Sequence, residues 1–452
     1  MKRLHPVSFA LLFGFAARLG LIFAWPSAFS NDGYQRWAGR EHLLVQDWLP
    51  ATQAIIATVA LLGGNIVAAR VAMALVGALA GAAATIVAMQ LGKRLGDEGG
   101  ATRAGWLMVV ASLYGPTIEW TTVLYQEGTF LLVLFSAIAL ALSGRTRLAD
   151  LVIGLMGLVR YEGWPCVALY VLWRRDRRAL VALYGIAIWM VIRFVLHMEP
   201  YRSSPVNFAD WEGLTDRFRF KAWMWDVWRF WTRAWATGGS FWLILALVGF
   251  VRLRRESTAW LVTGMFMVQA AATSAWLAGL EVSTSRMLII PVALGSPLAA
   301  VAAAWIWPKL RRPTLYFIAS AALVIFSAME INDAGMRMKH EQRRMVAERK
   351  VIEEMDKCGG CTWWIEPRKK LGTRERHDGC EAIQGMSGYM HGREFWCAPW
   401  VPSIEAASLY ATCSGTVRWD GERYVVERHL PGGSGAPPLP IDGAVQAGPA
   451  DE

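Results

Sequence analysis

Carboxylate and guanidinium side chains stand at the ends of long apolar runs in this sequence. Asp32 follows the first run, Glu127 begins another, and Arg160 and Glu162 share the segment Leu158–Gly163. Carboxylates can accept protons, and guanidinium groups bind phosphate, so these residues point to acid–base and phosphate chemistry. Because ionisable groups at membrane depth are costly, they are by default candidates for function.

More polar residues occur in two loops between apolar runs. Asp47 belongs to the element Asp47–Pro50, which precedes a short apolar stretch. The segment Met198–Gly239 interleaves six tryptophans with charged residues and also contains Arg202 and Lys221. This composition is typical of an amphipathic helix that lies on a membrane. It is either an aromatic belt without a ligand or a lid that grips a lipid chain and presents cations to its phosphate.

Each of these residues also has a purely structural interpretation. Asp32 could be the N-cap of a helix. Glu127 could be placed at a helix start because the helix dipole favours a carboxylate there. Arg18 and Arg193 could extend to the membrane interface with their charges in water. The sequence alone leaves both interpretations open.

The composition sets the class of protein to which these residues belong. The chain has 452 residues, of which 55% are hydrophobic and 18% charged, and its mean hydropathy is +0.31. Globular chains average roughly 45–50% apolar and about 25% charged residues. A fully soluble enzyme and a disordered or fibrous chain are therefore excluded. The net charge of +10 is expected at the ends of membrane spans, so no nucleic-acid partner is predicted.

The apolar runs predict an all-α membrane protein with about eleven spans of roughly 20 residues. The stretch Leu49–Leu62 is short for a span and fits an interfacial or re-entrant helix better. The predicted spans are Phe9–Trp25, Val67–Leu91, Gly105–Trp120, Thr129–Ser143, Leu148–Leu158, Gly163–Trp173, Leu180–His197, Ser240–Val251, Thr258–Leu280, Met287–Trp307 and Leu315–Glu330.

The positions of basic residues predict how the spans are oriented in the membrane. With Leu49–Leu62 left out, the clusters of Lys and Arg between spans all fall on one side, which the positive-inside rule assigns to the cytoplasm. The N-terminus is then cytoplasmic and the C-terminal region lies outside, in a bacterial inner or plasma membrane. The carboxylates and arginines described above gather at the outer ends of the spans. Any chemistry is therefore expected at the outer boundary between membrane and water.

The C-terminal region has a different character. We expect residues 1–331 to form the membrane domain, 332–430 a small extracytoplasmic domain that begins with a helix, and 431–452 a disordered tail rich in Pro and Gly. The small domain holds five cysteines. An outer compartment favours disulfides, although Cys358 and Cys361 with His377 and Cys380 could instead form a zinc site or a redox pair. The sequence does not determine the disulfide connectivity.

Residues 1–331 resemble the polytopic glycosyltransferases of the GT-C superfamily, which include protein mannosyltransferases and transferases that attach aminoarabinose to lipid A. The resemblance rests on short motifs. These are Arg18 in the first span, Asp32 directly after it, the element Asp47–Pro50, Glu127 at the head of the fourth span, Leu158–Gly163 and Ser285–Pro291. Two features depart from the family: Asn31-Asp32-Gly33 stands where a paired acidic motif is common, and the tail with its cysteines matches nothing in it.

The resemblance implies transfer of a monosaccharide from a polyprenyl-phosphate donor to a glycan, lipid or protein acceptor, with inversion, on the extracytoplasmic side. Asp32 would be the base that takes the proton of the acceptor hydroxyl. Asp47 and Glu127 would orient the acceptor or the sugar hydroxyls. The donor phosphate is a good leaving group, so cations matter more than a general acid. The residues expected to bind lipid phosphate or sugar are Arg160, Glu162, Arg286, Arg202 and Lys221.

Other possibilities remain beside this one. A divalent cation could bind at Asp32, but no clear ligand cluster accompanies this residue. A transporter or lipid flippase would carry polar residues near the middle of the membrane and an internal repeat. A non-enzymatic membrane subunit would use the tail to bind a partner. The position of the charges at the outer ends of the spans favours the glycosyltransferase over the transporter.

Overall fold

Two compact units divide the chain, namely Met1–Leu21 with His42–Gly335, and Ile22–Glu41 with Met336–Glu452. The structure is a computed structural model. It describes residues 5–28, 49–96, 99–196, 239–276, 284–309 and 313–356, short pieces between 33 and 43, residues 224 and 228, and five strands after residue 361. The predicted domain bounds at 331 and 430 remain a prediction.

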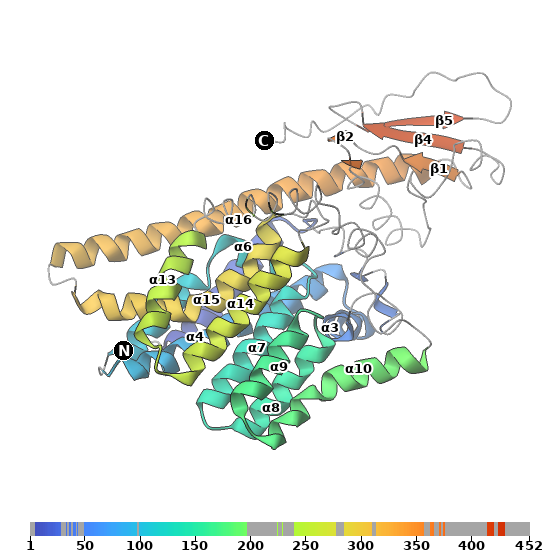
Figure 1. Cartoon of the computed structure of the whole chain (residues 1–452). Helices are drawn as coiled ribbons and strands as arrows, with labels where there is room; N and C mark the ends of the chain where they lie inside the picture. The colour runs from blue at the N-terminus through green and yellow to red at the C-terminus, as the bar shows by residue number, and fades with distance from the viewer. Residues whose placement is uncertain are drawn as a thin grey trace. The chain divides into compact units, whose positions relative to one another are not determined.

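The described residues form thirteen α-helices, and strands occur only after residue 361 (Figure 1). The helices are α1 (Pro6–Ala24), α3 (Pro50–Leu61), α4 (Ile66–Gly92), α5 (Gly100–Ala111), α6 (Gly115–Trp120), α7 (Glu127–Leu142), α8 (Thr146–Gly154), α9 (Gly163–Arg174), α10 (Tyr184–Val195), α13 (Gly239–Arg252), α14 (Ser257–Trp276), α15 (Thr284–Ile306) and α16 (Pro313–Asp356). Short 3-10 helices include η2 (Lys93–Leu95), η3 (Leu155–Leu158) and η4 (Arg177–Leu183).

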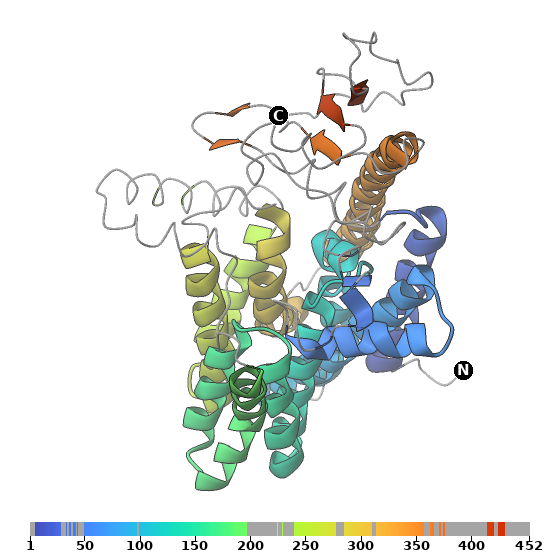
Figure 2. The ribbon, with the colours of Figure 1, turned by 90° about the vertical axis from the view of Figure 1, so that its right-hand side faces the viewer.

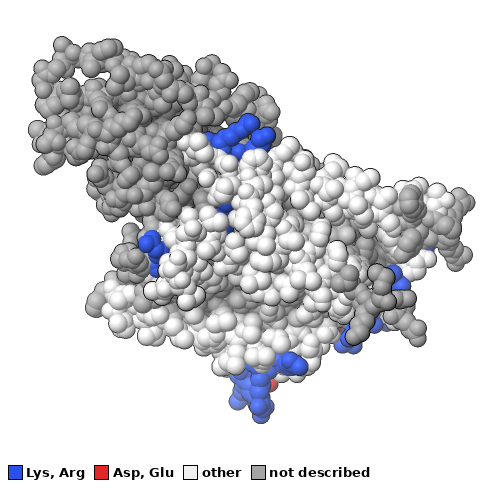
Figure 3. Space-filling model, turned by 180° about the vertical axis from the view of Figure 1, so that it is seen from behind, with Lys and Arg blue, Asp and Glu red and all other residues white. Residues whose placement is uncertain are grey.

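Helical segments are found in the described parts of all eleven predicted spans, and α3 covers most of the short stretch Leu49–Leu62. In the described residues, five helical segments are long and apolar enough to cross a membrane: Pro6–Ala24, Ile66–Leu95, Arg177–Val195, Ile289–Lys309 and Ile318–Lys339. Figure 3 shows one face of the molecule on which a wide surface is mostly without charge, with Lys and Arg at its edges. The chain therefore has the features of an integral membrane protein, whereas eleven crossings and their direction remain predictions.

One predicted span is not a single continuous helix. The run Gly105–Trp120 is two helices, because α5 ends at Ala111 and α6 begins at Gly115. Pro116 stands in the first turn of α6, where its missing N–H costs nothing, but it cannot continue the preceding helix. The freed N–H of Gly115 donates to Oε2 of Glu330 in α16 at 2.6 Å. The proline and this carboxylate together explain why an apolar run is broken here.

The core of the first unit forms around α15, which contacts α13, α14, α4 and α5. Helices α7 and α8 pack together, and α9 packs against α14, so these elements lie side by side in both ribbon views (Figure 1, Figure 2). Small residues permit these close approaches. A Cβ atom at Gly249 in α13 would overlap the carbonyl oxygen of Leu298 in α15.

The second unit contains the described strands. Strands β1 (Thr362–Ile365), β4 (Ser414–Trp419) and β5 (Tyr424–His429) form a sheet in the order β1-β4-β5, in which β1 and β4 are parallel and β4 and β5 antiparallel. Strands β2 (Lys370–Leu371) and β3 (Arg374–Glu375) form a separate antiparallel pair. The helix expected at the start of this region is the end of α16. The five cysteines of the tail lie outside the described residues.

The contact between α13 and α15 can be tested at Gly249. The substitution Gly249→Ala should lower the free energy of unfolding by about 1–3 kcal/mol, because a methyl group must displace the backbone of α15. Thermal unfolding of the detergent-solubilised protein measures this change. The matched control is Gly20→Ala in α1, where nothing lies within 4 Å of the added Cβ. Equal melting temperatures for the two variants would contradict the close packing.

Candidate functional site

Glu127 is the first residue of α7, and only 1% of its side chain is exposed. The positive end of the helix dipole favours a carboxylate at this position. The carboxylate also accepts a hydrogen bond from Nη1 of Arg160, with 2.8 Å between Nη1 and Oε1. The position of Glu127 therefore agrees with the helix-dipole interpretation, and the structure adds an ion pair with Arg160 that the sequence did not predict.

Arg160 holds a second carboxylate at the same time. Its Nε donates to Oε2 of Glu162 at 3.2 Å, and its Nη2 donates to Oε1 at 2.8 Å. Such a two-point contact fixes the planes of both groups relative to each other. We refer to Glu127, Arg160 and Glu162 as the Arg160 cluster. It joins the start of α7 to the residue that precedes α9.

In the Arg160 cluster one guanidinium faces two carboxylates. Burial by itself would raise the pKa of Glu162, but the charge and the hydrogen bonds of Arg160 outweigh burial and lower that pKa below its ordinary value of 4.5. Glu162 is thus an ionised hydrogen-bond acceptor at neutral pH. The cluster is suited to accept hydrogen bonds from hydroxyl groups or to attract a cation, and it is not suited to attract another anion.

Aromatic and amide side chains hold the segment that carries Arg160 and Glu162. Gln269 of α14 donates from Nε2 to the backbone oxygen of Glu162 at 2.6 Å and lies 3.3 Å from Sγ of Cys166. Trp189 of α10 donates from Nε1 to the hydroxyl of Tyr161 at 3.2 Å. Two helices, α14 and α10, therefore hold this short segment. Sequence reasoning missed Gln269, although an amide within the apolar run Thr258–Leu280 was a signal.

Two buried arginines hold the turn before Glu127. Arg18 of α1 donates from Nε to Oγ1 of Thr121 at 2.8 Å, and Gly77 of α4 leaves the space that its side chain occupies. Arg70 of α4 donates from Nε to the backbone oxygen of Thr122 at 3.1 Å. The interpretation that Arg18 extends to the interface was therefore wrong, because a partner in the protein binds it at a buried position.

Arg193 likewise does not extend into water. Its side chain is fully buried, and its guanidinium carbon lies 5.4 Å from the ring centre of Trp189 in the same helix. A guanidinium over an indole face gains a cation–π interaction, which is stronger when water is excluded. The interfacial interpretation of Arg193 was wrong for the same physical reason as that of Arg18.

The structure brings together three of the predicted site residues, namely Glu127, Arg160 and Glu162. Arg286 lies in α15, but its side chain is outside the described residues. Asp32, Asp47, Arg202 and Lys221 also lie outside the part of the chain that the structure describes. Their roles remain predictions.

No metal centre is visible in the described part of the chain, where no three or more His, Cys, Asp or Glu side chains form a group that could hold an ion. The proposed cation site at Asp32 falls outside these residues and is not tested. In the Arg160 cluster, the positive charge next to both carboxylates is supplied by the guanidinium.

No protein-family model matches this sequence, and no curated protein matches it. The resemblance to the GT-C superfamily therefore remains a prediction from short motifs.

Removal of the shared guanidinium should destabilise the fold. Arg160→Ala removes the guanidinium from one buried carboxylate, Glu127, and one partly buried carboxylate, Glu162, which costs about 3–5 kcal/mol of unfolding free energy. Thermal unfolding in detergent measures the loss. As a control, Arg94→Ala removes a solvent-exposed ion pair of 3.8 Å, worth about 0–1 kcal/mol. Arg160→Ala that melts like Arg94→Ala would refute the structural role of the cluster.

The lowered pKa of Glu162 predicts a dependence of stability on acid. Its contribution is complete above the ordinary value of 4.5 and is lost as the pH falls through the lower pKa of the folded state. The difference in melting temperature between wild type and Glu162→Gln should therefore be large at neutral pH and should narrow as the pH falls below 4.5. A pH series of thermal unfolding curves measures the difference. A constant gap would contradict the ion pair.

Proposed function

We propose that the protein is a membrane glycosyltransferase that moves a monosaccharide from a polyprenyl-phosphate donor to an acceptor on the extracytoplasmic side. The observation that supports this most is the Arg160 cluster. Glu127 and the pair Arg160 and Glu162 were selected from two separate motifs of the GT-C resemblance, and in the structure they are directly hydrogen-bonded. Residues that share a site are expected to meet in this way.

The reaction requires one base and several cations. Asp32 accepts the proton of the acceptor hydroxyl while the hydroxyl oxygen forms a bond to the anomeric carbon. The bond between the anomeric carbon and the phosphate oxygen breaks at the same time, and polyprenyl phosphate leaves with the electron pair. Attack from the opposite face inverts the configuration. Arg286, Arg202 and Lys221 stabilise the charge on the departing phosphate.

The geometry favours sugar hydroxyls over phosphate as the ligand of the Arg160 cluster. All three nitrogen atoms of the Arg160 guanidinium donate to carboxylate oxygens, so Glu127 and Glu162 hold this group in place. The two carboxylates in turn offer acceptors to hydroxyl donors. In this proposal Arg160 is a positioning residue that holds the two carboxylates, and phosphate binding falls to Arg286 and the large loop.

The overall activity is tested by deleting the gene and comparing lipids and glycans by mass spectrometry. We expect the acceptor glycan, lipid or protein to lose the mass of one monosaccharide, while the polyprenyl-phosphate sugar accumulates. Restoring the gene should reverse both changes. Unchanged lipid-linked sugars and glycans would reject the proposal and would favour a transporter or a non-enzymatic subunit.

The role of Asp32 is tested by Asp32→Asn in the same complemented strain. Loss of the base should reduce transfer by about 10²–10⁴-fold, so the lipid-linked sugar should accumulate as in the deletion. The protein should remain in the membrane at normal abundance. Glu256→Gln, which removes a partly exposed carboxylate, serves as a control that retains transfer. Near-normal transfer by Asp32→Asn would show that another group is the base.

A further inference from the structure

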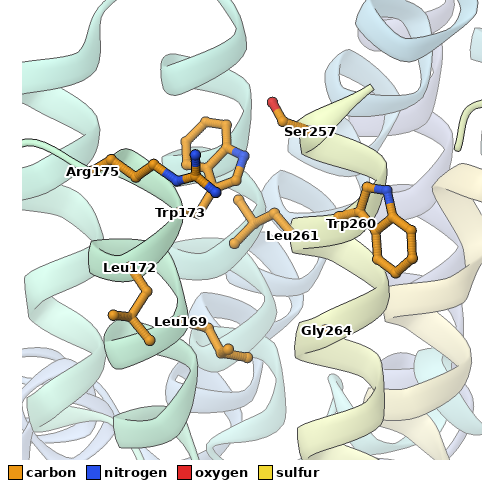
Figure 4. A pocket seen from close by; sticks show the side chains of 8 residues that line it. All are labelled: Leu169, Leu172, Trp173, Arg175, Ser257, Trp260, Leu261 and Gly264. Atoms are coloured by element: carbon orange, nitrogen blue, oxygen red, sulfur yellow. The ribbon is translucent and has the colours of Figure 1, made fainter. Parts of the chain in front are cut away.

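A groove of about 580 Å³ separates α9 and α14 at the end where α9 stops and α14 begins (Figure 4). Its walls are aliphatic, with Leu169 and Leu172 on α9 and Leu261 on α14, and Gly264 adds no side chain to the floor. The side chain of Leu172 is 71% exposed. The groove therefore offers an open, largely apolar surface between the two helices on which a hydrocarbon chain could lie.

The open end of the groove is polar. Arg175 follows α9, and Ser257 is the first residue of α14 (Figure 4). The neighbouring Arg174 pairs with Asp150 at 3.2 Å and with Asp176 at 3.8 Å. By contrast, no carboxylate among the described residues lies within ion-pair distance of Arg175. An exposed cation and a hydroxyl thus lie where the apolar walls end.

The backbone of Arg175 adopts a conformation that normally selects glycine. Its φ is 51°, and the other residues with positive φ in the described chain are Gly63, Gly96 and Gly144. A residue with a Cβ in this left-handed region costs free energy that glycine would avoid. Strain of this kind is frequent where a side chain has a function. Arg175 caps α9 as a glycine could, and in addition it presents a guanidinium to the groove.

The position of Trp260 indicates that the polar end of the groove lies at the level of the lipid headgroups. This residue borders the groove, its indole Nε1 donates to the backbone oxygen of Arg254 at 2.8 Å, and its largely exposed ring packs edge-to-face on Phe250 of α13. Tryptophan with its polar edge toward basic residues and its ring toward apolar surface is typical of the lipid headgroup level. The nearby Glu256 is engaged at 3.8 Å by Arg94.

A second groove repeats this design on the other side of the same turn. It measures about 670 Å³ and combines Leu247 and Val251 of α13 with Arg252, Arg254 and Arg255. Each of the two grooves has its own apolar wall, and arginine lies at the end of each wall. They lie at the end of the helices that the positive-inside rule assigns to the cytoplasm, where the leaflet is anionic.

We propose that the groove between α9 and α14 binds an anionic glycerophospholipid, with the phosphate at Arg175 and Ser257 and one acyl chain along Leu169, Leu172 and Leu261. A guanidinium and a hydroxyl match a phosphodiester, and the aliphatic walls match its chain. The site is separate from the Arg160 cluster, and it does not depend on the proposed transferase activity.

The substitution Arg175→Gly tests the site, because it separates binding from folding. Glycine suits the left-handed backbone, so the melting temperature of the full-length protein should stay the same or rise. Binding of dioleoyl phosphatidylglycerol, measured by native mass spectrometry of the detergent-solubilised protein, should weaken about fivefold, the value of one arginine near an anionic surface. Dioleoyl phosphatidylcholine should bind the variant and the wild type alike.

Two further variants complete the experiment. Gly264→Leu keeps every charge but adds a side chain to the groove; its Cβ would be in ordinary contact with Cδ1 of Leu169 at 3.7 Å, and thermal unfolding checks that the variant folds. It should also reduce phosphatidylglycerol binding. Arg147→Gln removes an exposed arginine elsewhere and should leave binding unchanged. If Arg147→Gln weakens binding as much as Arg175→Gly, or if Arg175→Gly destabilises the protein without affecting binding, the proposal is overturned.

Discussion

The guanidinium of Arg160 joins two carboxylates that come from different parts of the bundle, and the surrounding helices are arranged about this contact. Glu127 begins α7, and Glu162 directly precedes α9, so one side chain fixes the positions of both helix starts. The charge and the hydrogen bonds of Arg160 lower the pKa of Glu162 although burial alone would raise it, so the contact also keeps that carboxylate ionised. The same contact brings two carboxylates together, and their oxygen atoms are the hydrogen-bond acceptors that the proposed sugar site would use.

Arginine side chains have a second role in this fold: they donate hydrogen bonds to oxygen atoms in a turn between two helices. The turn between α6 and α7 is irregular and buried, and a buried carbonyl without a partner costs free energy. Arg70 donates to the carbonyl of Thr122, and Arg18 binds the side chain of Thr121. Irregular backbone can therefore exist between apolar helices, and it ends at Glu127, where the candidate site begins.

The helices were predictable because each apolar run of sufficient length must satisfy its backbone internally. The break before Gly115 was missed, although Pro116 was a local signal for it. The partners of Arg18 and Glu162 could not be predicted, because Thr121 lies 103 residues after Arg18, and Gln269 lies 107 residues after Glu162. Charge type and spacing indicated which residues were candidates, but only the packing of α1, α4 and α14 determines what each one binds.

The order of residues along the chain has a consequence for biosynthesis. Arg18 and Arg70 precede the α6–α7 turn, so their donors are available as soon as the turn leaves the ribosome. Glu127 must wait for Arg160, which is synthesised 33 residues later. At roughly 5–20 residues per second, this delay lasts a few seconds. During that interval Glu127 lacks the guanidinium that holds it in the folded protein, so the contact between the start of α7 and the segment before α9 can form only after Arg160 has been synthesised.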